Sequence, residues 1–568
     1  MNRRVFIKNA SILTTVAPFS SIYPESLFQS NQEIPDWILS LTPLADTSVE
    51  NQLKLQNREE GPDFGGLTDP YRIFNPHSTA GLVRVGACCL YLPNSKYHRS
   101  IELIQRMDEA MAYLLTLQHE DGTIDLMSTN FHSTPDTGFI AKRLCNAWRL
   151  IDRLKMKESA PLLEKIKTFL RKAADALTVG GIHTPNHRWV VCGALASIYA
   201  LWPSQKYLNR IEQWLAEGID LDPDGQYNER STYIYSSLSN RVLITIAQYT
   251  GKTYLLDYVR KNLDMTRYYV HPNGEIVTDA SGRQDKATIG MMENYYYPYR
   301  YMAILDNNET YAGMCRYIEE TAGTKIIGHL DYYLTDELLW KQIGKGTPPP
   351  SSYVKSLPYS GLVRIREGIW DASIISKNPT WLTFMKGNAV IQGVRLASSF
   401  FGKGQFISEK IETTSDGWRL TQVLEGPYYQ PLAPNLLPGD GDWAKMPRIQ
   451  RPPSEVQNLE TVVNIRKTTK GITFDVNSKG TNRVPLAIEI IFREGGVFQG
   501  VESVPHTPKS WVLASGMGSY TYEGHTIRFG PGINQHLNTV LRGALAHTGS
   551  PSVFLTGFTP FSHTIHLE

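Results

Sequence analysis

The sequence predicts a two-domain protein: an N-terminal (α/α) toroid, an incomplete helical barrel, followed by a C-terminal antiparallel β-sandwich. Two observations predict this order. From about residue 100 to residue 305 the chain carries successive amphipathic segments of helical period. Beyond residue 359 it carries short alternating runs rich in β-branched and aromatic residues. Helices and strands therefore segregate along the chain, which indicates separate all-α and all-β units.

Residues 1–29 are predicted to be an export signal. Arg3 and Arg4 are followed by Phe6 and then by a modestly apolar stretch, a pattern that resembles the twin-arginine signal. No later stretch has the roughly 20 uninterrupted apolar residues that cross a bilayer. We therefore expect an exported bacterial protein, periplasmic or extracellular, without a membrane span.

Residues 30–344 are assigned to the toroid because two kinds of helix alternate in this region. The segment 158–177 has a clear charged face, whereas 186–202 is apolar nearly all round, as a helix covered on both sides must be. Inner helices that line a cleft and outer helices that wrap them would produce this alternation, although a helical solenoid would give a similar pattern. HEDGTIDL, DPDGQYNE and HPNGEIVT, which start at residues 119, 222 and 271, predict tight turns at one end of successive helices.

Residues 345–358 include GTPPPSSYVKSLP and are predicted to form a stiff Pro-rich linker. Residues 359–568 consist of short alternating runs split by Gly, Asn, Asp and Lys turns. This segment is the predicted sandwich.

The composition excludes several classes of protein. Lys plus Arg number 57 against 55 Asp plus Glu, so the protein has no strong positive field to attract nucleic acid. The five cysteines show no CxxC pair, which excludes a zinc ribbon. Tyrosine is abundant, with 30 residues against 19 Phe and 11 Trp, and would suit an aromatic-walled groove or simply half-buried surfaces.

The first candidate cluster stands at the start of the helix that is apolar all round. Pro185 imposes an extended conformation on the preceding residue, so Asn186 is predicted to cap this helix, with His187 and Arg188 beside it. Asn186 and His187 would then lie at the end of the cleft. A capping Asn beside a surface His is the alternative explanation.

The second candidate cluster runs from Asp224 to Arg241 and includes Glu229, Arg230, Tyr233 and Tyr235. On an α-helix the two tyrosines point about 200° apart, so only one of them can face the cleft. A local ion pair between Glu229 and Arg230, with both tyrosines in the core, is the alternative.

Four further residues are candidates for the wall of the cleft. His132 and Asp136 stand before a predicted helix, Arg283 lies in a polar loop, and Tyr295 begins a run of three tyrosines. Each has an equally good structural explanation: a turn or helix cap for Asp136 and its neighbours, a solvated loop for Arg283, and a core position for Tyr295.

These motifs resemble those of the heparinase II/III-like polysaccharide lyases and their alginate-lyase relatives. TPNHRW is followed along the chain by DGQYNERSTYIY and by NR, in a helical domain that precedes a sandwich. The resemblance implies that Asn186, with His187, neutralises a uronate carboxylate and that a Tyr of the next inner helix exchanges protons. Tyr233 and Tyr235 fall one residue before and one after the usual position, so both remain candidates. His271 and His329 are candidates for a further His of the family.

The predicted chemistry is cleavage of a uronate glycan by β-elimination, with no metal or cofactor. The proton α to the carboxylate is removed and the oxygen at C4 is expelled, so fixed donors must hold the carboxylate. Asn186 and a protonated His187, helped by Arg188 or Arg230, are the expected donors, and a Tyr is the base, the acid or both. The residues expected to bind the substrate are Arg188, Glu229, Arg230, Arg241, His132, Asp136, Arg283 and Tyr295.

Two other functions fit the sequence. A glycoside hydrolase on the same toroid would need paired carboxylates, for which Asp136 and Glu229 are available. A non-catalytic glycan-binding protein would use the tyrosines as stacking platforms. The near-zero net charge favours alginate, glucuronan or the glucuronate caps of arabinogalactans, including rhamnose-linked glucuronate, over a heavily sulfated glycan such as heparin.

Overall fold

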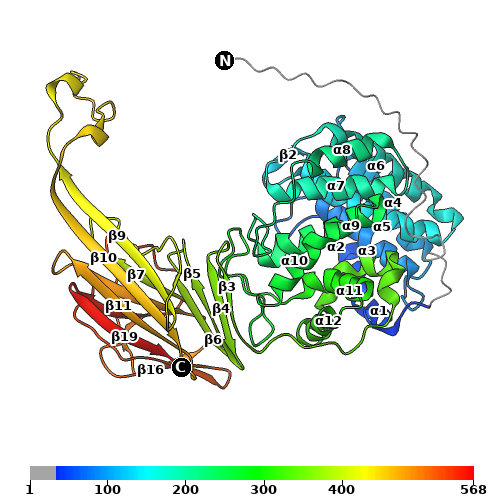
Figure 1. Ribbon diagram of the computed structural model, residues 1–568. Helices are drawn as coiled ribbons and strands as arrows, with labels where there is room; N and C mark the ends of the chain where they lie inside the picture. Colours follow the sequence, from blue (N-terminus) through cyan, green and yellow to red (C-terminus); the bar gives the residue numbers. More distant parts are fainter. Residues whose placement is uncertain (1–32) are drawn as a thin grey trace, which may run out of the picture.

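The computed structural model describes residues 33–568, and the predicted export signal lies outside this range. A helical domain and a β-sandwich stand side by side (Figure 1). This order of helices before strands confirms the predicted fold class. Among residues 33–568, none of the helices has the length and apolar character needed to cross a bilayer.

The helical domain has an inner and an outer layer. Neighbouring inner helices contact one another in the order α3, α5, α7, α9, α11, and each is followed in the chain by an outer helix that packs on it. The inner helices are α3 (Pro76–Tyr91), α5 (Thr134–Arg153), α7 (Pro185–Tyr199), α9 (Ser237–Thr250) and α11 (Tyr296–Leu305). The outer helices are α4 (Ile101–Leu117), α6 (Ala160–Val179), α8 (Gln205–Leu215), α10 (Leu255–Thr266) and α12 (Glu309–Ala322).

Short elements complete the helical domain. The inner helix α3 precedes the region in which the sequence predicted helices. Helix α13 packs against α3 and α5, so the inner helices surround a central space and do not stack in a line. The short elements are α1 (Asp36–Leu39), β1 (Ile124–Leu126), β2 (Asn130–Ser133) and α13 (Leu330–Thr335), and a longer helix, α2 (Thr42–Leu55), packs on α3.

Burial explains why the two kinds of helix alternate. In α7, 11 of 15 residues are buried, whereas only 8 of 20 are buried in the outer helix α6. Because α7 is covered on both sides, its sequence has no polar face. The predicted toroid layers are confirmed in this pair.

The three predicted turns share one geometry. Gly122, Gly225 and Gly274 have φ of 85°, 98° and 90°, in the left-handed region that favours glycine. A Cβ at Gly225 would come within 2.6 Å of the Lys261 carbonyl oxygen. In each turn the backbone N–H and C=O groups close the same pair of hydrogen bonds, His119–Thr123 with Gly122–His119, Asp222–Gln226 with Gly225–Asp222, and His271–Glu275 with Gly274–His271. The three segments form tight turns, as the sequence predicted, and the structure shows that all three repeat one geometry.

Two sheets form the sandwich within the described chain, and one parallel pair, β15 with β18, interrupts the otherwise antiparallel pairing. The eight-stranded sheet has the order β13 (Val497–Gln499), β16 (Gly518–Tyr522), β17 (His525–Gly530), β19 (Phe561–Leu567), β11 (Ile472–Gly480), β10 (Pro453–Lys467), β9 (Trp418–Tyr429), β8 (Glu412–Thr413). The nine-stranded sheet has the order β14 (Glu502–Ser503), β15 (Ser510–Val512), β18 (Ser552–Phe558), β12 (Pro485–Phe492), β7 (Ala389–Ser398), β6 (Leu382–Lys386), β5 (Trp370–Ile375), β4 (Leu362–Glu367), β3 (Ser352–Leu357).

The domain boundary differs from the predicted one. Strand β3 begins at Ser352, inside the segment 345–358 that was predicted to be a linker. The stretch after the prolines alternates between exposed and more buried side chains, and its backbone pairs with β4 from Ser352 to Leu357. After residue 351 the alternation of exposed and more buried side chains, which is typical of a strand, therefore predicts the structure better than the prolines that precede it.

The two domains are packed against each other. Met265, Tyr269 and Val277 of the helical domain share a buried cluster with residues of the sandwich. Arg493 also donates hydrogen bonds of 2.9 and 2.7 Å to the carboxylate of Glu275. The sandwich thus lies against the end of the toroid where the inner helices begin.

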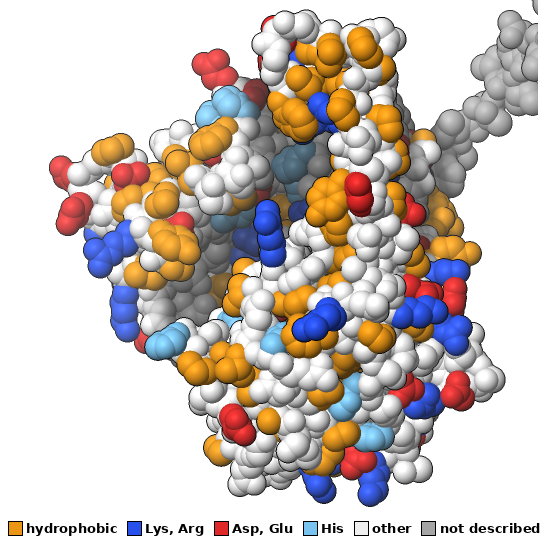
Figure 2. Space-filling view, turned by 90° about the vertical axis from the view of Figure 1, so that its left-hand side faces the viewer, with side chains coloured by type: hydrophobic (Ala, Val, Ile, Leu, Met, Phe, Trp, Pro, Cys, Tyr) orange, Lys and Arg blue, Asp and Glu red, His pale blue; other side chains and the backbone are white. Residues whose placement is uncertain are grey.

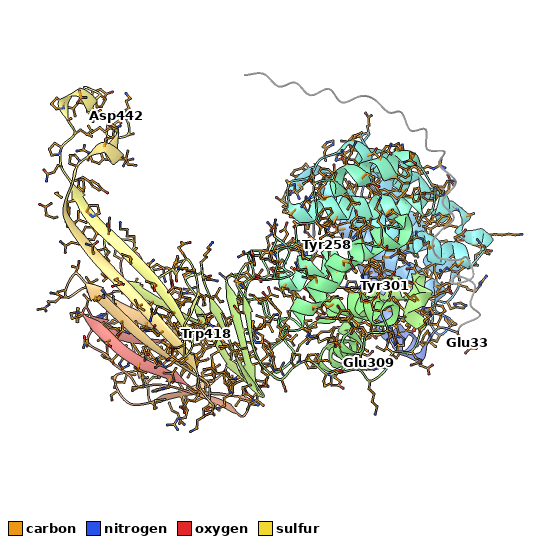
Figure 3. The ribbon with its side chains drawn as sticks, in the orientation of Figure 1. Glu33, Tyr258, Tyr301, Glu309, Trp418 and Asp442 are labelled. Atoms are coloured by element: carbon orange, nitrogen blue, oxygen red, sulfur yellow. The ribbon has the colours of Figure 1, made fainter. Side chains whose placement is uncertain are left out.

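Strands β9 and β10 extend beyond the rest of the sandwich as a long hairpin. The segment between them, 430–452, carries Asp442 at the far end of this projection (Figure 3). Exposed apolar side chains, such as Trp443 and Ile449, gather there.

Candidate active site

A central cavity of about 400 Å³ opens in the helical domain. Seen from the side of the sandwich, the molecule is hollowed, and histidine and basic side chains are visible inside the hollow (Figure 2). Residues of α3, α5, α9 and α13 line the cavity, together with the segments that precede α9 and α11. The cavity is therefore surrounded by inner elements of the toroid.

A π-helical turn, Thr232–Ser236, leads into α9 and carries both candidate tyrosines. The N–H of Tyr235 donates to Ser231 Oγ at 3.1 Å, and the N–H of Tyr233 donates to Asp285 Oδ2 at 3.0 Å. π-turns are rare and are frequent at functional sites. Of the two tyrosines only Tyr235 lines the cavity, in agreement with the prediction that only one of them faces the cleft.

The two phenol groups differ in their partners. Gln284 Nε2 donates to the Tyr235 oxygen at 2.5 Å, and the guanidinium of Arg283 lies 5.5 Å from the Tyr235 ring centroid. Tyr233 instead donates its O–H to Glu293 Oε1 at 2.8 Å. Burial and this hydrogen bond raise the pKa of Tyr233 to about 12. Tyr235 is therefore the better placed proton-transfer group.

Asn186 is not the helix cap. Helix α7 begins at Pro185, so Thr184 occupies the capping position and Asn186 lies in the first turn. Proline suits the first helical position because it lacks the N–H that would be left unsatisfied there. Thr184 Oγ1 donates to Asn186 Oδ1 at 2.8 Å. The amide nitrogen of Asn186 is buried without a hydrogen-bond partner among the described residues.

His187 is neutral, contrary to the expected protonated form. Burial, and then the neighbouring His183, lower the pKa of His187 to about 4. Its Nδ1 is buried and lacks a partner within residues 33–568. The ring meets the edge of Phe139, which lines the cavity. His187 can offer a neutral N–H or a lone pair, but not a positive charge at neutral pH.

Glu229 and Arg283 connect Asn186 with Tyr235. Arg283 Nε lies 3.1 Å from Glu229 Oε2, and the backbone N–H of Asn186 donates to Glu229 Oε1 at 3.5 Å. Burial raises the pKa of Glu229, while the charge of Arg283 acts against that rise. The alternative ion pair between Glu229 and Arg230 is not formed. Arg283 therefore supplies the positive charge beside Tyr235.

Four predicted substrate contacts lie elsewhere. Arg188 stacks on Trp189 and is paired with Glu217 and Asp220. Arg230 donates to the Tyr359 carbonyl at the domain boundary. His132 is exposed and paired with Asp121. Tyr295 is fully buried, and its O–H donates to the Thr232 carbonyl at 2.6 Å, so its prediction as a substrate contact is wrong.

Of the two further histidine candidates, one lies at the cavity and one does not. His329 lines the cavity and accepts a hydrogen bond of 3.0 Å from Arg241 Nη1, which also lines it. His271 Nδ1 is 2.8 Å from Asp371 of the sandwich. His271 therefore holds the two domains together and does not face the central cavity.

Sequence reasoning missed most of the basic lining. Arg84 of α3, and Lys142 and Arg143 of α5, line the cavity together with the predicted Asp136. A Lys-Arg pair inside the otherwise apolar run GFIAKRLCNAW was the signal available for two of them. Burial acts to raise the pKa of Asp136, but His77, whose Nε2 is 3.3 Å from Asp136 Oδ1, and a hydrogen bond from Ser133 lower it overall. Asp136 is thus a tightly held carboxylate.

No protein-family model and no curated protein sequence matches the chain. Solved structures do. Heparinase III aligns at a TM-score of 0.55 with 12% identity, over 97% of this chain and 86% of that one. Xanthan lyase of Paenibacillus aligns at 0.54 with 9% identity, over 96% of this chain and 58% of that one. A mutant chondroitin AC lyase of Streptomyces coelicolor A3 aligns at 0.52 with 11% identity, over 95% and 81%. The chain has the helical toroid plus β-sandwich fold of these polysaccharide lyases, as the resemblance implied.

Proposed function

We propose that this protein is a polysaccharide or oligosaccharide lyase. It breaks the bond to the C4 oxygen of a uronic acid, glucuronate in type, by β-elimination and leaves an unsaturated uronate. The observation that carries the proposal is a cluster beside the cavity, which we call the mouth. Its members Asn186, His187 and Arg283 do not line the cavity themselves, but His187 contacts Phe139 and Arg283 stands over Tyr235, and both of these side chains line it. Buried nitrogens of Asn186 and His187 lack hydrogen-bond partners among the described residues.

The carboxylate of the uronate is held by Asn186, His187 and Arg283. An unpartnered amide N–H and a guanidinium are suitable donors for an oxyanion. As the α proton leaves, negative charge moves onto the carboxylate oxygens, and donors already fixed in place stabilise this charge more than they stabilise the ground state. The ion pair with Glu229 orients the guanidinium of Arg283.

Tyr235 transfers the proton. Its oxygen, as phenolate, takes the proton from C5, the C4–O bond breaks, and a C4–C5 double bond forms. The same hydroxyl then returns the proton to the departing oxygen, so Tyr235 acts first as the base and then as the acid. Gln284 orients the phenol through its hydrogen bond to the Tyr235 oxygen.

The two rival functions have less support. Asp136 is bound by His77 and Ser133, which lower its pKa, so it is a poor proton donor for hydrolysis. Glu229, the other carboxylate, is only 5% exposed and is paired with Arg283. The tyrosines of the run Tyr295–Tyr297 are buried and cannot serve as stacking platforms.

The test is incubation of the purified protein with oligoglucuronate, alginate and the glucuronate-capped chains of arabinogalactan. The proposal expects ultraviolet absorbance from the unsaturated product, and formation of this product about 10³-fold more slowly in a Tyr235→Phe variant. Shortening of the glycan without this absorbance would show hydrolysis. Binding of every glycan without any cleavage would show a binding protein.

We also propose that the protein is exported. Support comes from the twin-arginine-like start of the chain, Arg3 and Arg4. Fractionation of cells that express the full chain should recover it outside the cytoplasm. Replacing both arginines by lysine should retain it in the cytoplasm, and equal distribution of the two forms would contradict the proposal.

A further inference from the structure

Basic side chains gather at the inner end of the central cavity. Four of them line it there, and they come from three different inner helices: Arg84 of α3, Lys142 and Arg143 of α5, and Arg241 of α9. We call this group the basic floor. None of the four belongs to the cluster that the proposed elimination uses.

The basic floor lies well below the mouth of the cavity. Arg241 follows Tyr235 by six residues along α9 and the turn that leads into it, and Lys142 follows Asp136 by six residues along α5. Six helical residues rise about 9 Å along the helix axis. The backbone positions of the floor are therefore set back from Tyr235 within the same cavity, a spacing that suits an anionic group on the sugar next to the one that is cleaved.

Within the described part of the chain, most of the charge on the floor has no anionic partner. Asp331 accepts a hydrogen bond of 3.0 Å from Arg84 Nη1 and one of 2.9 Å from Asn146. Among residues 33–568, Arg241 donates a hydrogen bond only to His329, whose pKa is held well below its ordinary value by burial and by Arg241. His329 is therefore a neutral partner.

Lys142 gives the clearest sign that the floor lacks a counter-charge. It is 6% exposed, and its Nζ lies 5.6 Å from the centroid of the Phe139 ring. Within residues 33–568 neither its amine nor the guanidinium of Arg143 has a hydrogen-bond or ion-pair partner. A buried cation without an anionic partner is costly. Such a cation facing a cavity is explained by a ligand that brings the counter-charge.

We propose that the basic floor is a second anion subsite, which takes a carboxylate or sulfate group on a sugar adjacent to the cleaved uronate. This inference rests on the proposed function and names its substrate class: acidic glycans that carry anionic groups on neighbouring sugars. Arginine forks and a lysine ammonium together suit the several oxygens of such a group. The low overall charge of the protein does not oppose this, because the positive charge is concentrated inside the cavity.

The first test compares two uronate substrates. One is an oligoglucuronate, in which every sugar is anionic, and the other alternates glucuronate with neutral glucose. The wild-type protein should have a kcat/KM about 30-fold higher on the oligoglucuronate. Lys142→Met and Arg143→Met should each reduce this preference about tenfold, mainly through KM, and leave cleavage of the alternating substrate within about threefold.

The matched control is Lys155→Met, which removes a lysine that lies just beyond the end of α5 and is 73% exposed. It should keep the full preference. Equal rates on the two substrates, or a preference unchanged in Lys142→Met, would overturn the second subsite while unsaturated product still supports the lyase function.

The second test needs no turnover. Inorganic sulfate is titrated calorimetrically into the full chain in buffers of different ionisation enthalpy. Burial, then Arg241 and Arg143, hold the pKa of Lys142 well below its ordinary value, so a bound anion should cause proton uptake. Binding and uptake should be lost in a Lys142→Met/Arg143→Met double variant. If sulfate binds in this way but no glycan yields unsaturated product, the lyase function fails and the anion site stands; absence of sulfate binding overturns the site.

Discussion

The mouth and the floor of the central cavity are both rich in polar side chains, but their charges are arranged in opposite ways. At the mouth Arg283 is paired with Glu229, and His77 lies 3.3 Å from Asp136, while buried nitrogens of Asn186 and His187 lack hydrogen-bond partners among the described residues. At the floor the cations outnumber their partners. An ion pair holds its two side chains in place at a small electrostatic cost. A buried cation without a counter-charge destabilises the empty protein, and an anion that binds beside it removes this cost. In our proposals the mouth performs the chemistry and the floor selects the substrate, and this difference in charge pairing is consistent with the two roles.

The largest expected effect separates the two tyrosines of the mouth. Tyr235→Phe should lower kcat by about 10³-fold, because it removes the proton-transfer group. Tyr233→Phe should lower it by less than about tenfold, because the Tyr233 hydroxyl is already donated to Glu293. Initial rates of unsaturated product formation measure both. A dominant loss in Tyr233→Phe would reverse our assignment of the chemistry to Tyr235.

The next effect concerns the carboxylate donors. Asn186→Ala should lower kcat by about 10²-fold, the usual result of removing one oxyanion donor. Thr184→Val removes only the hydroxyl that orients the amide of Asn186 and should cost less. Circular dichroism of both variants provides the control for folding. Wild-type rates in Asn186→Ala would show that the carboxylate binds elsewhere, with the basic floor as the first place to look.

A smaller effect should appear in the pH dependence of stability. The pKa of His187 is about 4 in the folded protein, below the ordinary value of about 6.5. As the pH falls through this window the unfolded chain binds the proton first, so the free energy of unfolding falls. Urea denaturation at about pH 7 and about pH 4.5 should show a smaller acid-induced loss in His187→Gln than in the wild type. An equal loss in both would mean that His187 does not titrate in this window.

The smallest expected effect concerns the loss of folding free energy that the buried basic side chains of the floor cause. Lys142→Met replaces a buried amine, which has no hydrogen-bond or ion-pair partner among the described residues, with an apolar chain of similar length, and should raise the free energy of unfolding by about 1 kcal/mol. Lys155→Met should change it by less than about 0.5 kcal/mol, as is usual for an exposed site. Urea denaturation in the absence of anions measures both. A destabilised Lys142→Met would show that the ammonium has a structural role and would remove the contrast between floor and mouth.

Much of the fold was predictable from local patterns. The all-round apolar character of α7 indicated an inner helix, and the repeated turns at Gly122, Gly225 and Gly274 indicated repeated hairpins. Helix α3 was missed because its polar starting residues and mixed inner face weaken the periodic signal. The segment Ser352–Leu357 was assigned to a linker because the prolines before it concealed a short alternation.

Only part of the candidate site was predicted from the sequence. Asn186, His187 and Arg283 were found because each stands at a local boundary, where a helix begins or a polar loop interrupts the pattern. Lys142 and Arg143 were missed because a charged residue within a helix is usually solvated or paired. Its burial becomes apparent only when the neighbouring helices are in place.

The sequence by itself determined the type and order of the elements, the repeated turns and the residues from which a proton-transfer site can be built. Only the tertiary structure decided that Tyr235 and not Tyr233 faces the cavity, because that choice depends on a π-turn and on Glu293, about sixty residues further along the chain. It also decided which charges are paired. Periodicity is a local property of the chain, whereas burial, pKa and pairing depend on contacts between helices that are distant in sequence.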